Sequence, residues 1–166
     1  MLLNRLQFSP ELIHARWEFG KLLTEDMPKL AQDALEHGYD GENIRKVAGL
    51  VAPTYFDLQP LKNGFPKELG IMQQLSKRDA GLLLSRLVAD GIAKGHIAPY
   101  EGARFIWHDI ATEHWDQETF RELSLFVGQA SEYEDCQFYA EHPEEVRREI
   151  ERNIVEYARE FSIGVR

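Results

Sequence analysis

Hydrophobic residues recur along this chain at intervals of three and four positions, which is the spacing of one face of an α-helix. The clearest example lies near the end, at Val146, Ile150, Ile154, Tyr157 and Phe161. Strictly alternating patterns, typical of β-strands, are scarce, and glycines and prolines fall between the periodic segments rather than within them. The pattern predicts an all-α fold, in which a single compact domain of seven to eight helices covers residues 1–166.

Helix start and stop signals place the boundaries of these helices. Ser9–Pro10 is typical of a helix N-terminus, and Gly38 and Gly95 are typical of C-termini. Between residues 53 and 70 the periodicity is lost, and we expect a connection that contains short helical turns. The seven helices that we expect begin near residues 10, 28, 40, 76, 99, 116 and 143.

The net charge of −9 is concentrated in one segment of the chain. From Asp109 to Glu145 there are eleven acids and a single base, Arg121, so this segment carries a charge of −10. The remaining residues hold 18 bases and 17 acids. An acidic surface repels the phosphates of nucleic acids, so direct binding to nucleic acid is not expected. A basic protein is the natural complement.

An apolar residue within the acidic segment predicts an interface rather than a merely solvated surface. A helix turns by about 100° per residue, so Glu118, Glu122 and Glu132 share one arc, with Leu125 in its middle. An apolar anchor ringed by charge is typical of a protein interface, whereas acids alone are usually a solvated face. The predicted partner-binding residues are Phe105, Asp109, Glu113, Glu118, Glu122, Leu125, Glu132, Tyr133 and Asp135.

The stretch SEYEDCQFYAEHPEE, from residue 131 to 145, adds three aromatic residues to the same segment. Tyr133, Phe138 and Tyr139 either border the binding face or pack locally beneath the C-terminal helix. The pattern leaves both interpretations open for each ring, and we expect the stretch to border the face.

The dipeptide His108–Asp109 offers an enzymatic alternative. With an apolar residue before it and an isoleucine after it, it resembles the central motif of the HD superfamily of all-helical, metal-dependent phosphohydrolases. The resemblance implies that both residues would ligate a divalent metal, with His37 or His96 and Asp135 completing the site. The arginine-led histidine motif that is usual upstream in that superfamily is missing here.

The other reactive residues predict no cofactor and no catalytic group. Glu11-x-x-His14 has the spacing of ferritin-like di-iron ligands, but the motif occurs once where such sites need it twice. His114 falls on a predicted buried stripe. Cys136, the single cysteine, lies among acids without an obvious histidine partner and allows no internal disulfide. The chain starts without a signal-peptide pattern and has no membrane-spanning apolar run, so we expect a cytoplasmic protein without a membrane role.

Two segments, ALEHGYDGENIRKVAGL (residues 34–50) and DGIAKGHIAPYEGARFIW (residues 90–107), share a helix that ends in glycine and a short turn that restarts a helix. In this respect the chain resembles small all-helical bacterial proteins encoded beside polymorphic toxins, some of which are immunity proteins of contact-dependent inhibition. The resemblance implies that the protein binds and neutralises a toxin domain, with a nuclease the best match to the charge. A generic helical interaction module is a third hypothesis.

Overall fold

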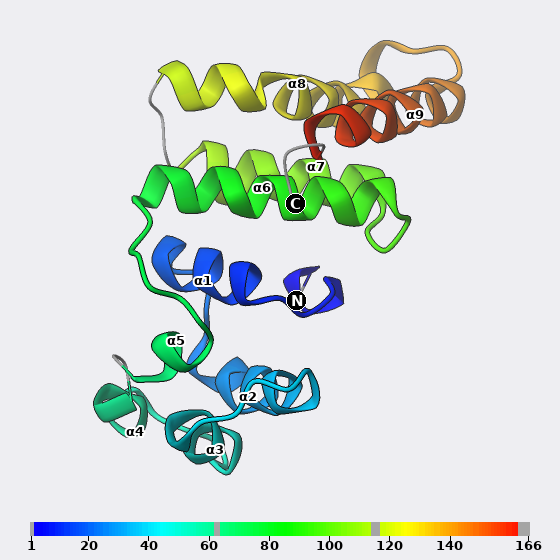
Figure 1. Cartoon of the computed structure of the whole chain (residues 1–166). Helices are drawn as coiled ribbons and strands as arrows, with labels where there is room; N and C mark the ends of the chain where they lie inside the picture. The colour runs from blue at the N-terminus through cyan, green and yellow to red at the C-terminus, as the bar shows by residue number, and fades with distance from the viewer. Residues whose placement is uncertain (1, 62–63, 114–116, 163–166) are drawn as a thin grey trace. The chain divides into compact units, whose positions relative to one another are not determined.

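The computed structural model of the protein describes residues 2–61, 64–113 and 117–162 (Figure 1). These residues form helices and connections without any β-strand, so the predicted all-α fold is confirmed. Each of the seven expected helices has a counterpart, and α4 and α5 are two short additions within the expected connection. The α-helices are α1 (Pro10–Phe19), α2 (Met27–Glu36), α3 (Glu42–Ala48), α4 (Tyr55–Leu58), α5 (Gly64–Glu68), α6 (Lys77–Ala93), α7 (Pro99–Phe105), α8 (Gln117–Tyr139) and α9 (Pro143–Ser162).

The chain divides into two compact units. The N-terminal unit is Gln7–Gly81, and the C-terminal unit consists of Met1–Leu6 together with Leu82–Arg166. The boundary between the units falls inside α6. The prediction that residues 1–166 behave as one domain stays a prediction.

In the N-terminal unit, α1 begins where the sequence predicts. The Ser9 hydroxyl accepts a hydrogen bond from the Leu12 backbone N–H at 3.1 Å, and Pro10 occupies the first turn. Gly20 ends the helix with φ of 80°, a conformation that favours glycine. The apolar core of this unit is formed by Ile13, Met27, Leu30, Ala31, Ala34, Ile44, Val47, Leu58, Phe65 and Leu69.

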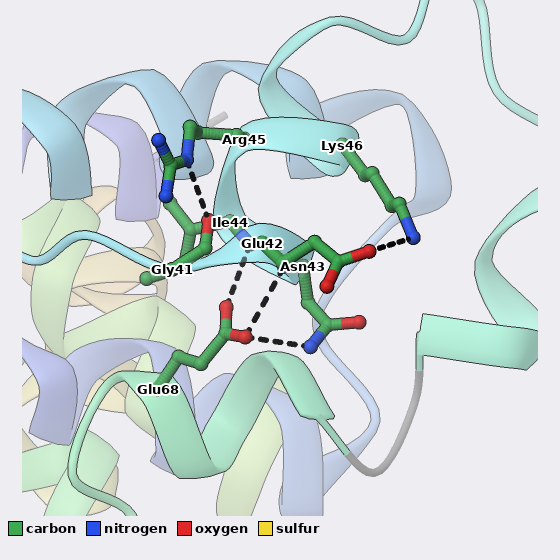
Figure 2. A network of polar contacts seen from close by, with 7 residues as sticks. All are labelled: Gly41, Glu42, Asn43, Ile44, Arg45, Lys46 and Glu68. Carbon is green, nitrogen blue, oxygen red and sulfur yellow. Dashed lines mark hydrogen bonds and ion pairs between the residues drawn. The ribbon is translucent and has the colours of Figure 1, made fainter.

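The helix α3 begins close to the expected residue 40 and has Gly41 as its N-cap residue, so the capping position itself carries no side chain. The side chain of Asp40 pairs with Arg45 at 3.2 Å. The first turn of α3 is capped from a distance by Glu68 at the end of α5 (Figure 2). One oxygen of this carboxylate accepts from the Ile44 N–H at 2.9 Å, and the other accepts from the N–H and side-chain amide of Asn43 at 3.2 and 2.6 Å. The cap therefore joins two helices that are separated by the 15 residues 49–63 in sequence.

Replacing Glu68 with glutamine should lower the free energy of unfolding by about 1–2 kcal/mol at pH 7, because a charged cap accepts these bonds better than an amide. Partial burial alone would raise the pKa of Glu68, but the bonds from Ile44 and Asn43 outweigh it and lower the pKa below the ordinary value. A depressed pKa contributes stability above the unfolded-state pKa of about 4.3, and this is lost as pH falls through the folded-state pKa.

The measurement is urea unfolding of wild type and Glu68→Gln at several values between pH 7 and pH 3. The stability difference should shrink as the pH falls. The variant Glu36→Gln, at an exposed carboxylate on α2, is the matched control and should keep wild-type stability. A difference that stays constant with pH would contradict the proposed role of the charge.

In the C-terminal unit, α8 and α9 run antiparallel and pack against each other and against α7 (Figure 1). The ring centroid of Phe126 on α8 lies 4.7 Å from that of Tyr157 and 5.5 Å from that of Phe161, both on α9. At Gly102, α7 lies so close to α6 that a Cβ atom would be 2.5 Å from Cδ1 of Ile92. After α7 the chain continues into a π-helical turn, Ile106–Ala111, which also packs on α8.

Candidate functional site

The exposed side of α8 forms a continuous stripe. Its members follow one another at intervals of three and four residues, so they lie along one side of the helix. We name it the outer stripe of α8, and it consists of Glu118, Arg121, Leu125, Gly128, Glu132, Asp135 and Tyr139, all exposed.

The opposite side of α8 explains why this helix forms and which way it faces. Leu123, Phe126 and Ala130 are completely buried, and Thr119 is nearly so. α9 covers one side of α8, and α7 and the π-helical turn cover another. The exposed arc of α8 is therefore narrower than the exposed arc of a helix that packs against a single neighbour. The stripe is therefore centred near Gly128, rotated away from the predicted arc of glutamates.

Exposed apolar side chains lie near the middle of the outer stripe and at its C-terminal end. Leu125 is 54% exposed, and Tyr139 is 62% exposed about 21 Å further along the helix. Phe138, beside Tyr139, is 80% exposed. Glu132 and Asp135 lie between these anchors. Exposed large apolar side chains among acids on one uninterrupted helix are suited to a partner that supplies both basic groups and apolar pockets.

Three of the predicted contacts are not available as expected. The prediction for Phe105 is wrong, because it is only 9% exposed, in a helix covered by both α8 and α9. Glu122 is half-buried, and its backbone carbonyl accepts a hydrogen bond from the Tyr157 hydroxyl of α9 at 2.9 Å. Tyr133 is half-buried, and its ring stacks on that of Tyr100 with 4.0 Å between centroids.

The remaining predicted contacts are distributed unevenly. Leu125, Glu132 and Asp135 belong to the outer stripe and Glu118 begins it. Glu113 is exposed just after the π-helical turn, and Asp109 is half-buried within it. The expected helix start near residue 116 and the expected core histidine His114 lie outside the described residues.

The sequence predicts that the aromatic stretch borders the binding face, and its pattern does not single out Gly128. Tyr133 packs locally beneath the C-terminal helix, with the guanidinium of Arg147 5.1 Å from its ring, whereas Phe138 and Tyr139 do not. A glycine within a helix is the signal that could have identified Gly128, because it weakens the helix without an evident reason.

A cluster around Glu134 accounts for His108. The Tyr100 hydroxyl donates to Oε1 of Glu134 at 2.8 Å, and Nε2 of His108 lies 4.0 Å from the same oxygen. Burial, followed by the hydrogen bond to this carboxylate, raises the pKa of Tyr100. The ring of His108 stacks on Trp107 at 4.3 Å. Over residues 2–61, 64–113 and 117–162, no three His, Cys, Asp or Glu side chains are grouped so that they could hold a metal ion. The phosphohydrolase alternative stays a prediction.

The other reactive residues have local contacts. Glu11 is exposed, and His14 lies instead near Glu18, with 3.8 Å between Nε2 and Oε1. Cys136 is completely buried in α8, and its thiol lies 3.3 Å from the Tyr133 carbonyl oxygen.

No protein family, curated protein or solved structure matches this chain. None of the helices in the described ranges is long and apolar enough to cross a membrane.

Proposed function

We propose that this is a cytoplasmic immunity-type protein that binds and neutralises a basic toxin domain, a nuclease, through the outer stripe of α8. The observation that carries the proposal is the exposure of Leu125, Phe138 and Tyr139 beside the acids Glu132 and Asp135. A partner that covers these exposed apolar side chains removes their surface from water, which favours binding. The acids select a partner of opposite charge.

The chemistry of a nuclease fits this surface. An enzyme that cleaves nucleic acid needs a basic cleft to attract phosphates, and an acidic helix can occupy that cleft. Opposite potentials accelerate the encounter, and the apolar anchors Leu125, Phe138 and Tyr139 then slow dissociation. Neutralisation by occlusion requires neither a cofactor nor a catalytic group.

Gly128 supports the close approach of a partner. It lies midway between Leu125 and Glu132, and a Cβ atom built on it would have nothing within 4 Å. Glycine at such a site costs about 1 kcal/mol of helix stability relative to alanine, and no contact in the described residues requires it. A partner backbone that crosses α8 at this point gives the glycine a function, because only glycine lets two main chains come so near.

Charge reversal on the stripe tests the proposal. The variant Glu132→Lys/Asp135→Lys should bind the partner about 10- to 100-fold more weakly than wild type, because two attractive pairs become repulsive. The measurement is a pull-down from lysate of the source cells at low and high salt, with bound proteins identified by mass spectrometry. The recovered partner is then titrated against both proteins and assayed for nucleic-acid cleavage.

The matched control is Glu145→Lys/Glu149→Lys, which makes the same change of charge at exposed positions outside the stripe. It should bind as wild type does. An equal loss of affinity in both variants would show that only the net charge of the protein matters, and it would contradict the proposed face. A basic partner without toxic activity would instead favour the generic interaction module.

A further inference from the structure

The N-terminal unit contains a cleft of about 250 Å³ formed by α1, α5 and the segment after α5. Its apolar lining comes from Ile13 and Trp17 of α1, Pro66 of α5, and Ile71 and Met72. Met72 is 82% exposed at its rim. The rest of the lining is polar, from His14, Glu18, Lys67, Gln73 and Gln74. A concave surface that combines apolar walls with polar groups is suited to a small molecule that has both an apolar part and a polar part.

Polar groups without protein partners lie in this cleft. Nε2 of His14 is buried and has no hydrogen-bond partner, because Oε1 of Glu18 is too distant at 3.8 Å. Lys67 also lines the cleft, and within the described part of the chain its ammonium has no ion-pair partner. A buried polar atom without a partner destabilises a protein unless a bound molecule or water satisfies it.

We propose that this cleft binds an aromatic monocarboxylate. The indole of Trp17 and the thioether of Met72 provide the contacts that an aromatic ring prefers. The carboxylate accepts from the Lys67 ammonium and from Nε2–H of His14. Glu18 is the single acid of the lining and leaves one net cation at most, so a monoanion fits the charge better than a phosphate ester.

The polar end of the cleft is held in place by the cap of α3. Lys67 directly precedes Glu68, and the three bonds of Glu68 fix the end of α5 to the first turn of α3 (Figure 2). Preorganisation of this kind reduces the ordering cost of binding.

Isothermal titration of the full chain with naphthalene-2-carboxylate tests the site. We expect saturable binding with a stoichiometry of one, and at least tenfold weaker binding of the uncharged analogue 2-naphthalenemethanol. The variant Lys67→Glu should lose at least tenfold in affinity, and Met72→Asp should lose a similar amount at the rim. Both positions are exposed, and circular dichroism confirms that the variants remain folded.

The control Lys29→Glu makes the same change of charge at an exposed position that does not line the cleft, and it should bind as wild type does. Absence of saturable binding, equal affinity for the alcohol, or unchanged affinity in Lys67→Glu would overturn the proposal. None of these results depends on a toxin partner, so the site and the proposed function are tested separately.

Discussion

The variant Asp26→Asn loses about 3 kcal/mol of unfolding free energy, the largest effect that we expect from one substitution that leaves the side-chain volume unchanged. In the wild-type protein, the Asp26 carboxylate accepts a hydrogen bond from Nη2 of Arg16 at 2.6 Å, and the Arg16 side chain is completely buried. Nε of the same guanidinium donates to the Lys21 carbonyl at 3.3 Å. Burial lowers the pKa of Arg16, and the charge and hydrogen bond of Asp26 oppose that shift. Without the carboxylate, a buried cation loses its counter-ion.

Urea unfolding measures this loss. Asp33→Asn is the matched control, because Lys29, the ion-pair partner of Asp33, is exposed to solvent and such a pair contributes little to stability. The double variant Arg16→Met/Asp26→Leu should recover most of the stability, because it removes both charges together. Equal stabilities of Asp26→Asn and Asp33→Asn would show that the buried charge is satisfied without Asp26.

Alanine should have opposite effects on stability at two glycines of neighbouring helices. At Gly102 the new methyl group would lie 2.5 Å from Cδ1 and 2.7 Å from Cγ1 of Ile92, which is 2% exposed and has little room to move. Overpacking of this kind costs about 1–3 kcal/mol and exceeds the gain of about 1 kcal/mol in helix propensity. At Gly128 nothing opposes that gain, so Gly128→Ala should be about 1 kcal/mol more stable than wild type.

Thermal and urea unfolding of both variants measure a difference of about 1–3 kcal/mol between identical substitutions, because the gain in helix propensity is common to both. Gly128→Ala should also bind the partner at least about tenfold more weakly although it is more stable, because its methyl group blocks the close crossing. A variant that is stabilised and still binds as wild type does would remove Gly128 from the interface and leave the charge-reversal test unaffected.

The helix boundaries that the sequence predicts correctly depend on local chemistry. Ser9 and Pro10 at the start of α1, and Pro99 and Pro143 at the starts of α7 and α9, act through their own backbone and nearest neighbours. The start of α3 does not depend on local chemistry in this way, because its cap is the Glu68 carboxylate, 25 residues after Asn43 in the chain. No local pattern connects Asn43 with Glu68.

The candidate site was predictable in position along the chain and less so in orientation. Charge counting points to the segment that contains α8, and Leu125, Glu132 and Asp135 on that helix are exposed as expected. Helical periodicity finds the direction of burial only when one neighbour covers a helix, whereas α8 is covered from two directions and Phe105 is buried for a similar reason. The pairing of Arg16 with Asp26 and the cleft at Trp17 require the folded chain, because their members come from different elements.

The outer stripe of α8 shares no residue with the buried side of the same helix. Substitutions at Leu125, Glu132, Asp135 or Tyr139 therefore change what the surface recognises while Leu123, Phe126 and Ala130 keep the helix packed. Different residues of one 23-residue helix therefore determine recognition and folding. A lineage under pressure to match a changing partner could vary the first set freely, and related chains should then diverge along the stripe while they retain the core.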